Sequence, residues 1–79
     1  MKQYKVIIWG LGNVGRAAVR MIGERKSVKL VAAVDVDPNK VGKDAAGVFG
    51  FPDIGVKVTD DIDAALQLDA NCVLVFTPL

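Results

Sequence analysis

The sequence predicts an α/β fold in which helices cover both faces of a parallel β-sheet. Short apolar runs alternate with segments of helical periodicity along the 79 residues, which is the pattern of successive β-α-β units. The apolar runs show no polar alternation, as expected of strands buried on both faces. The segment Gly10–Gly15, which reads Gly-Leu-Gly-Asn-Val-Gly, joins the first apolar run to the first helical segment. Together these observations predict a partial Rossmann-type, doubly wound sheet with flanking helices.

The first half of the chain gives the clearest elements. A strand is predicted at about Tyr4 to Trp9, a helix from about Asn13 to Arg25, and a second strand from Val28 to Val34. Apolar residues in the helix recur at the i, i+3, i+4, i+7 spacing that predicts one core-facing stripe. The members of that stripe are Val14, Ala17, Ala18, Met21 and Ile22.

The second half is interrupted by glycines and is expected to be less regular. Asp37 is suited to cap a short helix with Pro38 at its first position, and residues 43–49 are expected to hold one or two helical turns. A short third strand is predicted at residues 56–59 and a fourth at residues 71–77. Between them, Asp60 is expected to cap a further helix.

Right-handed crossovers place these strands in the order 3-2-1-4. The direction of winding reverses between strands one and four, so Gly10–Gly15 should converge with Thr77 and Pro78, at the crevice where such sheets bind ligands. All of residues 1–79 are expected to form one domain. The fourth strand ends the sheet as an apolar edge, which predicts a homo-oligomer formed near residues 72–76.

The glycine segment, together with an acidic residue that follows the second strand, indicates a dinucleotide-binding site. A glycine at position 10 permits an unusual turn, one at 12 permits close approach of a pyrophosphate, and one at 15 permits close packing of the helix. The unpaired N–H groups of the helix N-terminus attract an anion. Asp35, twenty positions after Gly15, is placed to accept hydrogen bonds from ribose hydroxyls. The alternative is a tight strand-to-helix turn that binds nothing.

Composition excludes several other classes of protein. Hydrophobic residues make up 52% and charged residues 24%, which indicates a globular chain rather than a disordered one. The net charge of +1, with interspersed charges, predicts neither nucleic-acid nor membrane binding. No apolar run reaches the roughly 18 residues of a membrane-spanning helix.

The inventory of reactive side chains is also small. There is no histidine and one cysteine, so we expect no metal site and no catalytic residue in this chain. Cys72 cannot form an internal disulfide, which fits a cytoplasmic protein, and its apolar strand predicts a packed, inert thiol.

Residues 5–16, together with the run Val34-Asp35-Val36-Asp37-Pro38-Asn39-Lys40-Val41-Gly42-Lys43-Asp44 and residues 55–64, resemble the N-terminal domain of dihydrodipicolinate-reductase-like dehydrogenases. Within that family the similarity is greatest to the 2,4-diaminopentanoate dehydrogenases. Enzymes of this family are several times longer and carry a C-terminal substrate domain. The resemblance implies a cofactor-binding domain of an NAD(P)-dependent amino-acid or amine oxidoreductase, with no turnover expected from the 79-residue chain alone.

The resemblance also implies roles for individual residues. The pyrophosphate would lie against Gly10, Gly12, Asn13, Val14 and Gly15, the adenosine ribose against Asp35, and the nicotinamide half near Thr77 and Pro78. Arg16 could reach a phosphate, and Arg16, Lys40 or Lys43 could neutralise a ribose 2′-phosphate. Because the Asp35 carboxylate would repel that phosphate, NAD is the expected cofactor, with NADP also accepted. A nucleotide-sensing or CoA-type module without redox activity, or an engineered half-fold with little affinity for any ligand, stays open as an alternative.

Overall fold

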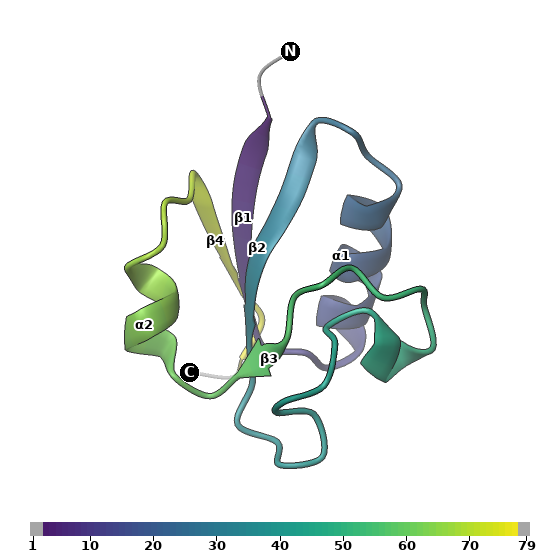
Figure 1. Ribbon diagram of the computed structural model, residues 1–79, viewed down its shortest axis with the longest axis vertical. Coiled ribbons are helices and arrows are strands. Elements are labelled where there is room, and N and C mark those ends of the chain that lie inside the picture. The colour runs from purple at the N-terminus through teal and green to yellow at the C-terminus, as the bar shows by residue number, and fades with distance from the viewer. Residues whose placement is uncertain (1–2, 78–79) are drawn as a thin grey trace.

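The structure is a computed structural model that describes residues 3–77. Four strands form one parallel sheet in the order β3-β2-β1-β4, as predicted. Helix α1 covers one face of this sheet and α2 the other (Figure 1). The elements are β1 (Tyr4–Trp9), α1 (Asn13–Gly23), β2 (Val28–Val34), a 3-10 helix η1 (Gly47–Phe49), β3 (Val58–Thr59), α2 (Ile62–Leu66) and β4 (Cys72–Val75).

Strand β1 carries the core on both of its faces. Ile8 is fully buried in the larger cluster, beneath α1 and the segment between β2 and β3. Its neighbour Ile7 is 1% exposed and packs in the smaller cluster with Ala65 of α2. Successive side chains of a strand point to opposite faces. The two clusters therefore lie on opposite sides of the sheet, which explains why β1 is apolar and buried from Val6 to Ile8.

The bounds of β1 and β2 agree with the prediction, while the first helix and the third and fourth strands are shorter than predicted. Helix α1 ends at Gly23, and β4 covers only Cys72–Val75. Strand β3 is limited to two residues, because Lys57 forms an antiparallel bridge with Asp44 instead of pairing with β2. Residue 57, just before β3, is thus paired with an earlier part of the same crossover, at Asp44.

The predicted core-facing stripe of α1 is partly wrong. The helix buries Gly15 and Val19 fully, with Ile22 partly buried beside them. Val14 is 60% exposed and Met21 54% exposed. The buried face is turned by about one residue because Gly15, which hydrophobicity alone does not count as apolar, makes the closest approach to the sheet.

Two predicted helix caps and the state of the cysteine also need correction. Asp37 begins a turn rather than a helix: its side chain accepts a bond from Asn39 N at 2.9 Å, and the left-handed Gly42 (φ 87°) ends the run. The cap of α2 is Asp61, which accepts from Ala64 N at 3.0 Å, and not Asp60. Cys72 is exposed rather than packed, because β4 is an edge strand.

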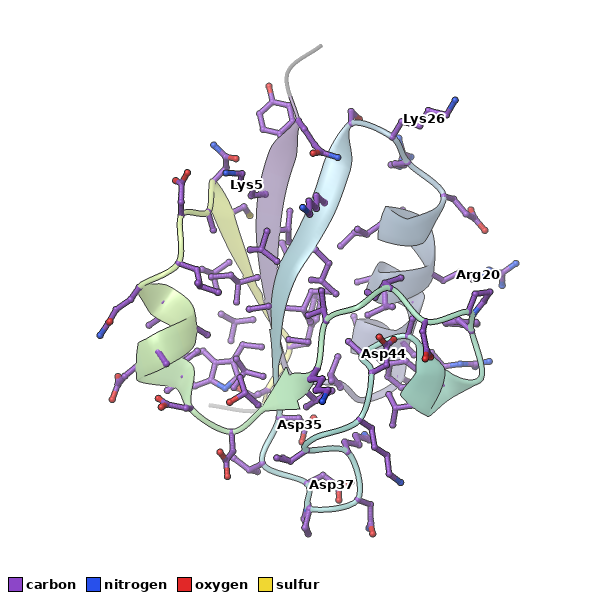
Figure 2. All side chains as sticks on the ribbon, viewed as in Figure 1. Lys5, Arg20, Lys26, Asp35, Asp37 and Asp44 are labelled. Carbon is purple, nitrogen blue, oxygen red and sulfur yellow. The ribbon has the colours of Figure 1, made fainter. Side chains whose placement is uncertain are left out.

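One carboxylate holds the long crossover between β2 and β3 together. Asp44 lies inside that crossover (Figure 2) and accepts hydrogen bonds from four backbone N–H groups at 2.8–3.2 Å. These belong to Ala46, Gly47, Ile54 and Gly55. Burial raises the pKa of Asp44, but these donors outweigh it and hold the pKa below the ordinary value of 3.8.

We predict that Asp44→Asn destabilises the chain at neutral pH by on the order of 1 kcal/mol, since charged acceptors form the stronger hydrogen bonds. A carboxamide NH₂ group would also face backbone donors. Because the folded pKa is lowered, the contribution of Asp44 is present above the unfolded value and is lost as the pH falls through the folded value, below about 4. Urea unfolding at pH 7 and pH 3 measures both effects. Asp60→Asn, at an exposed position, is the control, and equal effects of the two changes at pH 7 would contradict the prediction.

Candidate functional site

The turn between β1 and α1 depends on two glycines that touch each other. Gly10 has φ 109°, a left-handed conformation that disfavours any side chain. A Cβ added to Gly15 would collide with the carbonyl oxygen of Gly10. The sequence thus needs glycine at both positions for the helix to start directly against the end of the strand.

The N-terminus of α1 is open. Its N-cap is Gly12, no side chain caps it, and its first turn has no acidic residue. A Cβ added to Gly12 would meet nothing within 4 Å, so space remains in front of the helix. Among residues 3–77, no acceptor is bonded to the N–H groups of residues 12–15. Such groups, with the positive end of the helix dipole, suit an anion.

The other helix shows the contrast. In α2 the carboxylate of Asp61 accepts from Ala64 N, and Asp63 occupies the first turn. Of the two α-helices in the described part of the chain, α1 has neither a side-chain cap nor an acidic residue in its first turn.

Asp35 lies beside the glycine turn, at the carboxyl end of β2 (Figure 2). Its Oδ2 atom accepts from Leu11 N at 2.7 Å and its Oδ1 atom from Asp37 N at 2.8 Å. Burial raises the pKa of Asp35, but these two N–H donors and the Lys40 ammonium outweigh it, so the pKa lies below its ordinary value. Asp35 is therefore an ionised acceptor at neutral pH, next to the open helix end.

Strand β4 brings its carboxyl end to the same place. Phe76 N donates to Trp9 O at 2.8 Å, and a Cβ added to Gly10 would lie 2.9 Å from the Thr77 side chain. The predicted convergence of Thr77 with the glycine turn is thus present in the structure. Pro78 lies outside the described residues.

Arg16 packs near an aromatic ring, and the side chain of Val14 is exposed to solvent. The Arg16 guanidinium lies 5.6 Å from the centre of the Phe51 ring, and both residues line a groove of about 370 Å³ along the outer flank of α1. Asn13 also borders this groove. Gly12 and Asp35 are not among the residues that line this groove.

The structure shows a contact beside the glycine turn that the sequence did not predict, between Lys40 and Leu11. Lys40 Nζ donates to Leu11 O at 2.6 Å, while Leu11 N donates to Asp35. Lys40 is recognisable in the sequence only as a candidate for charge neutralisation, because a spacing of 29 residues gives no local signal. In the described part of the chain no helix is long and apolar enough to cross a membrane. Nor, between residues 3 and 77, do three potential metal ligands gather.

Comparison with known proteins identifies a family and several relatives of this chain. The sequence profile of the family described as "Dihydrodipicolinate reductase, N-terminus" matches residues 4–78. An amine dehydrogenase of Streptomyces virginiae is 45% identical over 70 residues, which cover 86% of this chain and 19% of that protein. A 4-hydroxy-tetrahydrodipicolinate reductase of Rhodopseudomonas palustris is 37% identical over 79 residues, which cover 98% of this chain and 29% of that protein.

A third relative is of a different kind. The redox-sensing transcriptional repressor Rex 1 of Thermotoga maritima is 37% identical over 54 residues, which cover 67% of this chain and 26% of that protein. The chain spans less than a third of the length of each of these three relatives.

Proposed function

The chain belongs to the family of the dihydrodipicolinate reductase N-terminal domain, and we propose that its glycine turn holds the pyrophosphate of a nicotinamide dinucleotide. The family expected from the sequence is thereby confirmed, while the greater likeness to the 2,4-diaminopentanoate dehydrogenases stays a prediction. The observation that supports the site most strongly is the open N-terminus of α1, where Gly12 leaves both space and unpaired donors.

The residues around this opening fit the two halves of such a cofactor. The backbone of Gly10, Gly12, Asn13, Val14 and Gly15 is proposed to line the pyrophosphate. Exposure of the Val14 side chain does not affect this role, since only its N–H would be used. Asp35 is proposed to accept the ribose hydroxyls, because each carboxylate oxygen has a second lone pair beyond its bond to the backbone.

The proposed site also includes Thr77, Pro78 and Arg16. Thr77, which lies against Gly10, is placed to border the nicotinamide half, with Pro78 after it. Arg16 would reach a phosphate only by leaving the Phe51 ring. The site residues with the least support from the described contacts are therefore Arg16 and Pro78.

The whole protein is proposed to be a cytoplasmic oxidoreductase that acts on an amine, an amino acid or a related compound. The bound nicotinamide would supply hydride transfer, and residues 1–79 would form the domain that binds and orients it. NAD is the proposed cofactor, with NADP accepted.

The likeness to a redox-sensing repressor favours a second candidate function. The same fold could report the binding of a nicotinamide dinucleotide to another part of a protein without any chemical step. Both candidates need the same binding site, so they differ in turnover and not in affinity. An engineered half-fold without ligand affinity is the remaining alternative.

Calorimetric titration of the chain with NADH, NADPH, ADP-ribose and CoA tests the proposal. We expect NADH and ADP-ribose to bind, and Gly12→Ala to abolish that binding while the chain stays folded, because the added methyl group meets only the space in front of the helix. Gly23→Ala, where a Cβ also meets nothing within 4 Å, is the matched control. Binding of CoA but not of NADH would contradict the proposal, as would an unchanged affinity in Gly12→Ala.

Cofactor choice is proposed to depend on Asp35. A carboxylate there accepts both ribose hydroxyls and repels a 2′-phosphate. Asp35→Ser should lower the affinity for NADH relative to NADPH on the order of tenfold, which corresponds to about 1.4 kcal/mol. The ratio of the two dissociation constants is the measurement, because loss of the bond to Leu11 N weakens both ligands alike. Asp37→Ser removes an equal charge from the same loop and should leave the ratio unchanged; a ratio unmoved by Asp35→Ser would exclude Asp35 as the ribose ligand.

Self-association along β4 is also proposed. Val73 and Val75 are 37% and 48% exposed, and β4 pairs only with β1 among residues 3–77. Covering this edge would bury apolar surface at about 25 cal/mol per Å². We expect a concentration-dependent dimer in sedimentation velocity, which Val75→Lys abolishes and Val36→Lys, at an 80% exposed loop position, does not. A monomer at all concentrations would overturn this proposal.

A further inference from the structure

Lys40 makes a contact that a solvated loop lysine would not make. Its ammonium lies 2.6 Å from Leu11 O and 6.0 Å from the centre of the Phe49 ring, and the side chain is half-buried. The neighbouring Lys43 is exposed. Lys40 is held in place from its own backbone as well, since its N–H donates to Asp37 O at 2.9 Å.

Leu11 is held from two sides as a result. Its N–H donates to the Asp35 carboxylate, its carbonyl accepts from Lys40, and its side chain is fully buried. Within the described residues no backbone N–H donates to that carbonyl. Lys40 is thus the partner that satisfies it.

The carbonyl of Leu11 and the N–H of Gly12 belong to one peptide group. That group is planar and trans, as no cis peptide bond is present in residues 3–77, so the two point in opposite directions. Fixing the carbonyl on Lys40 therefore fixes the Gly12 N–H on the side away from Lys40. A released carbonyl could rotate about the permissive backbone of Gly12, which would replace a donor by an acceptor at the mouth of the anion site.

We propose that Lys40 is a positioning residue for the anion site: its ammonium holds the Leu11 carbonyl so that the Gly12 N–H stays available to a phosphate. This inference rests on the proposed function for its ligand, but the contact itself is independent of any ligand. It assigns to Lys40 a role beyond the neutralisation of a 2′-phosphate, and it applies equally to ligands that lack that group.

The Gly12 amide resonance in a ¹H–¹⁵N NMR spectrum of the chain reports on this peptide group directly. We expect Lys40→Met to displace that resonance in the ligand-free protein and to weaken ADP-ribose binding about tenfold. Lys40→Arg, which keeps a charged donor, should restore most of the affinity. Lys40→Ala, which also removes the donor, is a second variant with the same expected displacement, in case the Met side chain prevents folding.

Lys43→Met is the matched control, because it removes the same charge three residues away. It should leave the Gly12 resonance in place and change the affinity less than twofold. If Lys40→Met and Lys43→Met weaken ADP-ribose binding equally, the effect comes from the loss of positive charge alone, and the proposal is overturned. A wild-type chain that fails to bind ADP-ribose would contradict the dinucleotide site, whereas a Gly12 resonance unmoved by Lys40→Met would contradict the positioning role whatever the ligand result.

Discussion

The contact between Gly15 and the carbonyl of Gly10 is the constraint on which the rest of the structure depends. It brings the first turn of α1 against the end of β1, closer than any side chain would allow. The rotation of the helix follows from it, since the face around Gly15 and Val19 must point to the sheet. The open N-terminus follows as well, because a helix that begins so abruptly has only Gly12 as its cap.

Two aspartates bind backbone N–H groups in the loops at this end of the molecule. Asp44 gathers four such donors within the crossover between β2 and β3, and Asp35 ties the glycine turn to the loop after β2. Glycine-rich segments cost conformational entropy when they are ordered, and charged acceptors offset that cost with their stronger hydrogen bonds. The glycine turn and the crossover are therefore each held by a carboxylate, Asp35 for the turn and Asp44 for the crossover.

The sheet order and the bounds of β1 and β2 could be predicted because they follow from apolar runs and crossover handedness. The buried face of α1 could not, since a hydrophobic pattern gives Gly15 no weight although steric contact makes it the closest point. Asp37 shows a second limit: a capping residue followed by proline is equally suited to a turn, and Gly42 decides between them. The pairing of Lys40 with Leu11 depends on how the crossover folds back, which no local pattern encodes.

In the proposed site, Asp35 would link the fixed loops to the choice of ligand. Each carboxylate oxygen accepts one backbone hydrogen bond, so the carboxylate is already held in place, and binding of a ribose would require little further ordering of this side chain. The Lys40 ammonium lowers the pKa of the same carboxylate and partly compensates its charge. A 2′-phosphate would therefore meet a weaker repulsion than an isolated carboxylate exerts, which is the physical basis of the proposed preference for NAD with NADP also accepted.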